Sequence, residues 1–243
     1  MTELKKLWHT VFGDAPSIID AYFDTFYSPE LTAAEFADGE LAAAAYVMPA
    51  GELVYGRRRE KCAHIYAVAV YPKFRGRGLG IAVTNRAVEK AKAAGYSAVI
   101  LHPAEESLFG YYEKNCGFET CFYGNFTEIV LPEGCADKSC ADIESYIACR
   151  ERFLQDIPHV ALSADILSFF VKCGGKLYAS EAGCAAVEII DGTAYFREML
   201  GDALLGITDA SDAFGSSPGT CAPVGMIHGK APFSDGWMGL SLE

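Results

Sequence analysis

The residue types best suited to chemistry gather in one short segment, Arg75-Gly76-Arg77-Gly78-Leu79-Gly80, between an apolar run and a stretch with helical spacing. The N-terminus of a helix presents backbone N–H groups without partners at the positive end of the helix dipole, and both favour a phosphate. Glycines allow a ligand to approach the backbone closely, and arginines carry the charge that complements a pyrophosphate. The segment is therefore predicted to bind a pyrophosphate. The alternative is a solvated basic turn.

Two nucleotide-binding motifs do not fit this segment. A P-loop needs a lysine after its last glycine, and the third glycine of a dinucleotide fingerprint is replaced by Ile81 or Val83. The spacing Arg75-x-x-Gly78-x-Gly80 instead resembles the loop of the GCN5-related N-acetyltransferases (GNAT superfamily), which binds the pyrophosphate of acetyl-coenzyme A. The run from Leu108 to Phe118 resembles a later helix and turn of that family, with one more residue before Gly117. The resemblance covers roughly residues 1–131.

This resemblance implies a cosubstrate and a set of site residues. The cosubstrate is acetyl-coenzyme A, and the acetyl group passes directly to a primary amine of a small molecule or peptide in a ternary complex. The residues expected to bind the cosubstrate are Val68, Val70, Arg75, Gly76, Arg77, Gly78, Leu79 and Gly80. Tyr112 is expected to protonate the departing thiolate, with Tyr111 as the alternative because of the extra residue.

The base that accepts the amine proton is less well defined by the sequence. The central strand carries His64 and Tyr66, and a histidine has a suitable unperturbed pKa. Glu105 and Glu106 could bind a cationic acceptor, and the terminal Glu243 is a further candidate for the base. The amine could also arrive deprotonated. A second interpretation is a non-catalytic acyl-coenzyme A sensor or interaction module.

The elements that must position these residues can be predicted from periodicity and turn signals. Two amphipathic helices are expected near the N-terminus, the second beginning near Pro16. Asp38-Gly39 predicts a hairpin between 32–36 and 41–48. The strand 62–71, the helix 81–94 with Gly95 after it, and the strand 97–101 form a unit that requires a parallel strand pair. Two final strands are expected at 119–122 and 126–131.

The C-terminal part is predicted to form a smaller second domain. Pro132-Glu133-Gly134 suggests a boundary, giving domains 1–131 and 132–243. Two helices near 143–154 and 166–170 precede a hairpin of 185–190 and 193–199 around Asp191-Gly192. A loop is expected at 211–223, and closing strands at 226–228 and 237–242. The fold class is thus α/β (α+β), a GNAT fold with a mixed central sheet flanked by helices, plus an α+β domain that could be a degenerate second copy.

Composition narrows the classes of partner. The chain has 243 residues, a net charge of -12 and a pI near 4.9, which argue against a nucleic-acid partner. No apolar run reaches the ~20 residues of a membrane span and no secretory signal is visible, so a cytoplasmic protein is expected. The nine cysteines lack a Cys-x-x-Cys pair, which favours free thiols and no metal. Oligomeric state is left open.

Overall fold

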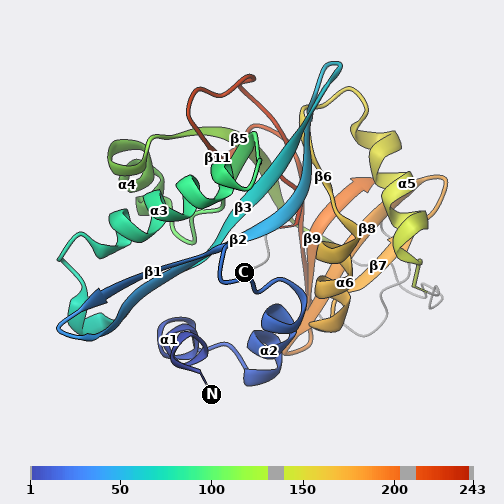
Figure 1. Ribbon diagram of the computed structural model, residues 1–243. Helices are drawn as coiled ribbons and strands as arrows, with labels where there is room; N and C mark the ends of the chain where they lie inside the picture. The colour runs from blue at the N-terminus through green and yellow to red at the C-terminus, as the bar shows by residue number, and fades with distance from the viewer. Residues whose placement is uncertain (1, 131–139, 203–211, 241–243) are drawn as a thin grey trace. The chain divides into compact units, whose positions relative to one another are not determined.

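The computed structural model describes residues 2–130, 140–202 and 212–240 (Figure 1). The chain divides into two compact units, and neither is a single continuous segment. Unit 1 comprises Met1–Glu52, Glu60–Thr120 and Gly225–Ala231, and unit 2 comprises Leu53–Arg59, Cys121–Val224 and Pro232–Glu243.

The described chain contains both helices and strands, and it ends with five successive strands, β7 to β11. The helices are α1 (Glu3–Phe12), α2 (Pro16–Thr25), the 3₁₀ helix η1 (Pro72–Phe74), α3 (Leu79–Ala93), α4 (Glu106–Cys116), α5 (Ile143–Leu154) and α6 (Ala164–Lys172). The strands are β1 (Thr32–Ala37), β2 (Glu40–Tyr55), β3 (Arg58–Val70), β4 (Ala98–Leu101), β5 (Phe118–Glu128), β6 (His159–Leu162), β7 (Lys176–Ala179), β8 (Gly183–Ile190), β9 (Thr193–Gly201), β10 (Asp212–Pro218) and β11 (Ala222–His228).

The sheet of unit 1 follows the order β1-β2-β3-β4-β11. The first pair is an antiparallel hairpin, β3 and β4 are parallel, and β11 closes the sheet antiparallel to β4. Helix α3 connects the parallel pair, as a crossover connection requires. The sheet is therefore mixed, as the sequence predicted.

Helices cover both faces of this sheet. Alternate β3 residues Ala63 and Ile65 belong to a buried cluster that also contains Val83 and Ala87 of α3 and Tyr112 of α4. Figure 1 shows α3 and α4 along one side of the sheet. The intervening β3 residues point the other way, which explains the second cluster on the α1 and α2 side. That cluster contains aromatic rings at centroid distances of 4.9–5.6 Å, namely Trp8, Tyr22, Tyr46 and Tyr66.

Unit 2 has a sheet with the order β5-β10-β9-β8-β7. Strands β7, β8 and β9 form an antiparallel meander, β9 and β10 are parallel, and β5 runs antiparallel to β10. Helices α5 and α6 precede the meander, and the apolar side of α6 is buried through Ile166, Leu167, Phe169 and Phe170.

The two sheets share one pattern of strand relations. In each, a hairpin leads to a parallel step, and an antiparallel strand from elsewhere in the chain completes the sheet: β11 in unit 1 and β5 in unit 2. The parallel pair of unit 2 is joined by only residues 202–211, which contain no arginine or lysine. Unit 2 therefore repeats the strand pattern without the basic loop.

Most local predictions are confirmed by the structure. Both Asp-Gly hairpins form, with positive φ at Asp38 and Gly39 and again at Asp191 and Gly192. Helix α3 ends before Gly95, whose φ is 85°. The parallel pairing of β3 with β4 is also confirmed.

Three predictions beyond residue 117 are wrong. The segment expected as two strands is one strand, β5, because Gly124 continues it and provides space for the Trp237 ring. The expected loop 211–223 contains strands β10 and the start of β11, and Gly215 fits there because a Cβ would lie 2.5 Å from Ile129 Cδ1. Within 237–240 there is no strand, only an isolated bridge from Trp237 to His159.

The remaining expectations concern the domain boundary, membrane-spanning helices and the cysteines. The boundary at Pro132-Glu133-Gly134 lies outside the described residues. In the described ranges no helix is long and apolar enough to cross a membrane. Of the eight described cysteines, five are buried and two, Cys140 and Cys221, are exposed. Cys135 lies outside the described residues.

Candidate functional site

The arginine- and glycine-rich loop leads from the end of β3 into α3, the helix that connects the parallel strands β3 and β4. The 3₁₀ turn η1 anchors its start, because Phe74 is only 3% exposed. Gly76 and Gly78 have φ angles of 78° and 76°, which a side chain would disfavour. Gly78 is the N-cap of α3 and offers no side chain to the first-turn N–H groups. The loop thus leaves the helix N-terminus open to an anion.

The two arginines of the loop are exposed but differ in their partners. Arg77 Nη1 lies 3.0 Å from Asp38 Oδ2, and its guanidinium lies 5.2 Å from the centre of the Phe74 ring. Arg75 has no carboxylate partner among the described residues. An exposed ion pair contributes at most ~1 kcal/mol, so Asp38 is a weak competitor for an anion at Arg77.

A bulge in β3 brings the end of that strand to the same face as the loop. Pairing with β4 joins only Cys62–His64 to Ala98–Ile100, and β3 continues to Val70 beyond the last described pair. Ala67 has a φ of 48°, which interrupts the alternation of side chains. Val68 and Val70 consequently pack against the α3 and α4 cluster on the face that Ile65 occupied before the bulge.

Tyr111 reaches this junction from α4. A Cβ at Gly80 would lie 2.9 Å from the Tyr111 hydroxyl oxygen and 3.7 Å from Val70 Cγ2. The phenol therefore lies beside the first turn of α3 and the end of β3, and only glycine at position 80 leaves space for it. Burial raises the pKa of Tyr111, so the hydroxyl remains a donor at neutral pH.

Tyr112 occupies a different environment although it is the next residue. It is 8% exposed and belongs to the core cluster, with its ring 6.1 Å from that of Phe118. Burial, followed by the neighbouring Tyr111 and Cys116, raises its pKa well above the ordinary value. The structure therefore places the sequence-predicted acid in the core and its alternative, Tyr111, beside the loop.

His64 is buried on β3, on the face opposite that of Ile65. It is 5% exposed, and its ring lies 5.8 Å from that of Tyr66. Burial, with a smaller contribution from His102, lowers the pKa of His64 to about 3. The imidazole is therefore neutral at pH 7 and holds an added proton weakly.

The acidic candidates lie at the start of α4 or beyond the described chain. Glu105 is the N-cap of α4 without a side-chain capping bond, and Glu106 is in its first turn, where a carboxylate is favourable with the dipole. Glu243 lies outside the described residues. Over the described ranges, no group of three or more His, Cys, Asp or Glu side chains could hold a metal ion.

Comparison with known families identifies this arrangement. A sequence model described as an acetyltransferase (GNAT) domain matches residues 1–121. Residues 1–121 form a GNAT domain. The predicted family resemblance is thus confirmed, and the arginine- and glycine-rich loop, β3 and α4 all lie within the matched residues.

A curated relative matches part of the GNAT domain. The glucosamine 6-phosphate N-acetyltransferase 1 of Oryza sativa subsp. japonica is 41% identical over 88 residues, which are 36% of this chain and 51% of the rice protein. The match thus spans about half the length of that relative.

Solved structures share the fold over most of the chain. A GCN5-related N-acetyltransferase from Kribbella flavida superposes with a TM-score of 0.65 at 16% identity, covering 92% of this chain and 67% of that one. Eis1 from Mycobacterium abscessus gives a TM-score of 0.58 at 15% identity, covering 86% and 61%. Both likenesses extend beyond the GNAT domain into the C-terminal part, and at these identities they concern the fold.

Three features of the site were not visible in the sequence. The Ala67 bulge has no glycine or asparagine to signal it, and the contact between Tyr111 and Gly80 joins residues from two helices. The Asp38 partner of Arg77 was assigned only to a hairpin turn, because a turn aspartate gives no signal of its tertiary neighbour.

Proposed function

We propose that this protein is an acetyl-coenzyme A-dependent N-acetyltransferase that transfers the acetyl group directly to a primary amine in a ternary complex. The observation that carries the proposal is the open N-terminus of α3, preceded by Arg75 and Arg77 and followed by a glycine at position 80, within a GNAT domain. This geometry suits a pyrophosphate. The loop residues Arg75 to Gly80 would hold that group.

The transfer forms a C–N bond and breaks the C–S bond of the thioester, while the amine loses one proton and the sulfur gains one. Backbone groups of Val68 and Val70, at the free end of β3, would align the pantetheine arm. Tyr112 is our candidate for the donor to sulfur, as the family resemblance implies; because burial raises its pKa, donation to the thiolate depends on the position of the phenol and not on its acidity. Tyr111 lies beside the loop and is better suited to bind the cosubstrate.

The role of His64 as base remains a prediction. A base is most effective when its pKa is near the working pH, and a pKa of about 3 is far below it. The acceptor could equally be bound as a neutral amine, in which case no side chain need take its proton during the transfer. Substrate binding beside His64 would have to raise that pKa for the imidazole to act.

The domain 132–243 is proposed to be a degenerate copy of the GNAT fold; its strands β7 to β10 form the sheet of unit 2 together with β5 of the preceding segment. The support is the shared pattern of strand relations and the absence of basic residues from 202–211, the counterpart of the phosphate-binding loop. Acetyl-coenzyme A would then bind unit 1 alone, with one site per chain.

The acceptor is best sought with a panel of amines. The rice relative acts, by its name, on glucosamine 6-phosphate, so this amino sugar belongs in the panel with amino acids, polyamines and a lysine peptide. Because Cys140 and Cys221 are exposed free thiols, a thiol reagent would react with the protein itself. Loss of thioester absorbance and mass spectrometry of the product avoid that interference.

The decisive experiment is calorimetric titration with acetyl-coenzyme A. Wild-type protein should bind one equivalent, and Arg77→Glu should abolish measurable binding because it places a carboxylate against the pyrophosphate. Arg57→Glu makes the same charge change in an exposed turn between β2 and β3 and should leave affinity unchanged. Unchanged affinity of Arg77→Glu would refute the loop assignment. Binding without amine-dependent turnover would instead favour the sensor.

A further inference from the structure

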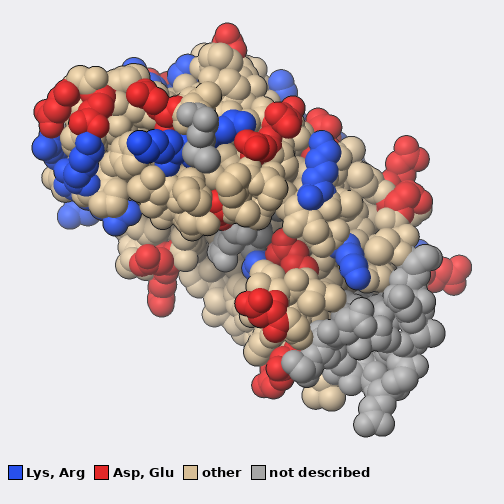
Figure 2. Space-filling model, turned by 90° about the horizontal axis from the view of Figure 1, so that it is seen from below, with Lys and Arg blue, Asp and Glu red and all other residues tan. Residues whose placement is uncertain are grey.

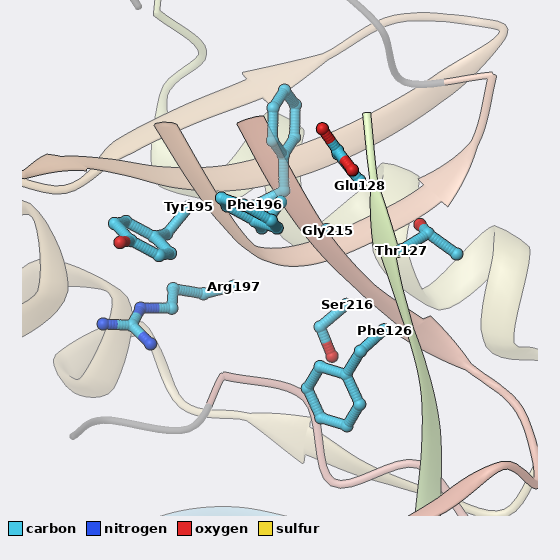
Figure 3. A pocket seen from close by; sticks show the side chains of 9 residues that line it. Phe126, Thr127, Glu128, Tyr195, Phe196, Arg197, Gly215 and Ser216 are labelled. Atoms are coloured by element: carbon cyan, nitrogen blue, oxygen red, sulfur yellow. The ribbon is translucent and has the colours of Figure 1, made fainter. Parts of the chain in front are cut away.

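The sheet of unit 2 carries a cavity of about 330 Å³ that the acetyl transfer does not use. It is formed by the ends of β5, β9 and β10, and Figure 3 shows the side chains that line it. This volume is at the lower end of the range for small-molecule pockets. The size therefore favours a small ligand over a protein segment.

Aromatic rings dominate the walls of this cavity. Phe126 and Phe214 are 61% and 45% exposed, which is unusual for side chains of this size in a sheet. The rings of Phe214 and Tyr195 lie nearly parallel, with an interplanar angle of 23° and centroids 6.1 Å apart. Strand register explains this, since Phe214 is directly opposite Tyr195 on β9 and Glu128 on β5.

The cavity has one unbalanced charge. Arg197 Nε lies 2.8 Å from Glu188 Oε2, so the charge of this arginine is neutralised within the sheet. Glu128 makes no ion pair with any described residue and lies at the opposite side of the aromatic row from Arg197, as Figure 3 shows. The net field at the aromatic rings is therefore that of a carboxylate.

Aromatic faces next to a carboxylate are complementary to an organic cation, because the negative face of each ring attracts positive charge. The unit already contains one such contact, with the Arg197 guanidinium 5.5 Å from the centre of the Tyr195 ring. The Ser216 hydroxyl, opposite Phe126 in register, adds a polar group near the lower ring.

We propose that this cavity is a binding site for a small organic cation, of the alkylammonium or aromatic ammonium class, distinct from the acetyl-coenzyme A site. Phe214 and Phe126 supply the aromatic faces, with the Tyr195 ring stacked on Phe214, and Glu128 supplies the counter-charge. The site lies wholly within unit 2, so it is independent of the proposed transfer reaction.

The test compares three probes of similar size that differ in charge: benzyltrimethylammonium, benzyl alcohol and benzoate. Binding to the full chain is measured by ligand-observed NMR titration. The cation should bind about tenfold or more tightly than the alcohol, as expected for a cation over aromatic faces beside a carboxylate. Benzoate should bind most weakly.

Two variants locate the site. Glu128→Gln, at an exposed position, should weaken binding of benzyltrimethylammonium several-fold and leave benzyl alcohol unchanged. Phe214→Leu keeps an apolar side chain but removes the ring, and should reduce the preference for the cation. Phe36→Leu removes another exposed ring, on β1 of unit 1, and should change nothing. Circular dichroism of each variant checks the fold.

The remaining outcomes would overturn the proposal. Equal binding of all three probes would mark a plain apolar groove, preferential binding of benzoate would assign the charge selection to Arg197, and absence of binding would leave no site. Concentration-dependent self-association that Phe214→Leu abolishes would make this face an interface between copies of the chain. Acetyl-coenzyme A titration of the same variants should give unaltered affinity, which separates this result from the proposed function.

Discussion

Two consecutive tyrosines on α4 illustrate how one residue step changes what a side chain can do. A step of one residue rotates a side chain by about 100° around a helix. Tyr111 consequently reaches Gly80 at the start of α3, whereas Tyr112 turns into the core beside Phe118. The pair therefore offers a direct way to separate cosubstrate binding from proton donation.

The Tyr112→Phe variant is expected to lower turnover by about 10²-fold or more, as for loss of a general acid, with little change in acetyl-coenzyme A affinity. The Tyr111→Phe variant should weaken that affinity several-fold and affect turnover less. Steady-state kinetics and calorimetry measure the two effects separately. Tyr96→Phe, a similar deletion elsewhere in unit 1, is the control. If Tyr111→Phe lost turnover and Tyr112→Phe did not, the two roles would be exchanged.

The buried imidazole of His64 predicts a dependence of stability on pH. Its folded-state pKa of about 3 lies below the 6.5 of an exposed histidine, so between these values the unfolded chain binds more protons. The titration of His64 therefore leaves the unfolding free energy unchanged above pH 6.5 and lowers it as the pH falls through 6.5 toward 3. At pH 5 the expected loss is about 2 kcal/mol.

Urea unfolding at pH 7 and pH 5 would measure this loss. The His64→Gln variant should show a smaller difference between the two pH values than wild-type protein. His9→Gln, at an exposed position on α1, should behave as wild type. An identical pH difference in His64→Gln would mean that His64 does not titrate as its burial implies.

At the scale of single residues, the sequence predicted the position of the arginine- and glycine-rich loop, but it did not predict the surroundings of Tyr111 and His64. Arg75, Gly78 and Gly80 were found because their spacing is local and distinctive. The position of the Tyr111 hydroxyl and the burial of His64 depend on how α3, α4 and β3 pack, and residue spacing carries no measure of that packing.

Among the elements, a buried charge network holds α5, β9 and the Trp237 segment of unit 2 together. Glu198 is fully buried and accepts hydrogen bonds from Tyr146, Arg150 and Trp237. Arg150 is 1% exposed and also donates to the Val160 carbonyl at 2.8 Å. Such a network is sensitive to the loss of one charge, because the buried Arg150 guanidinium would then keep only Glu151, 3.4 Å from its Nη1, as an ionic partner.

The Glu198→Gln variant should therefore lose about 3–5 kcal/mol of unfolding free energy. Adding Arg150→Met removes the buried arginine charge, while the side-chain amide oxygen introduced by Glu198→Gln can still accept from the tyrosine and tryptophan donors. The double variant should therefore be more stable than the single one. Denaturant unfolding measures both, with the exposed Glu181→Gln as control. A loss below about 1 kcal/mol in Glu198→Gln would contradict this account.

Elements with local signals were predicted well, and those fixed by distant contacts were not. The Asp-Gly turns carry their own left-handed conformation, so both hairpins were evident from sequence. Strand β10 has small residues that resemble a loop, yet Gly215 is required by the approach of Ile129. Strands β6 and β7, each four residues long, are too short to show a period.

For the whole molecule, the notable property is that unit 1 takes its closing strand, β11, from a distant part of the chain. Residues Gly225–Ala231 belong to unit 1, where Met226 is fully buried and pairs with Leu101 of β4. In Figure 2, acidic and basic side chains are interspersed over the described part of the face in view.

A fragment of residues 1–131 contains the GNAT motifs but lacks β11. We expect it to be largely unfolded, because the edge of β4 would be unpaired and the core around Met226 opened. A fusion in which residues 222–231 follow residue 131 should recover secondary structure. Circular dichroism and two-dimensional NMR compare the two. A well-folded fragment 1–131 that binds acetyl-coenzyme A as tightly as the full chain would contradict this.

The late position of β11 in the chain also affects how the protein folds during synthesis. Translation delivers the N-terminal part of a chain first, at about 5–20 residues per second. The strand that seals the sheet of unit 1 lies at Gly225–Ala231, so the nascent GNAT domain cannot complete its sheet until that late segment has left the ribosome. Until then the edge of β4 lacks its partner strand and is open to pairing with other chains.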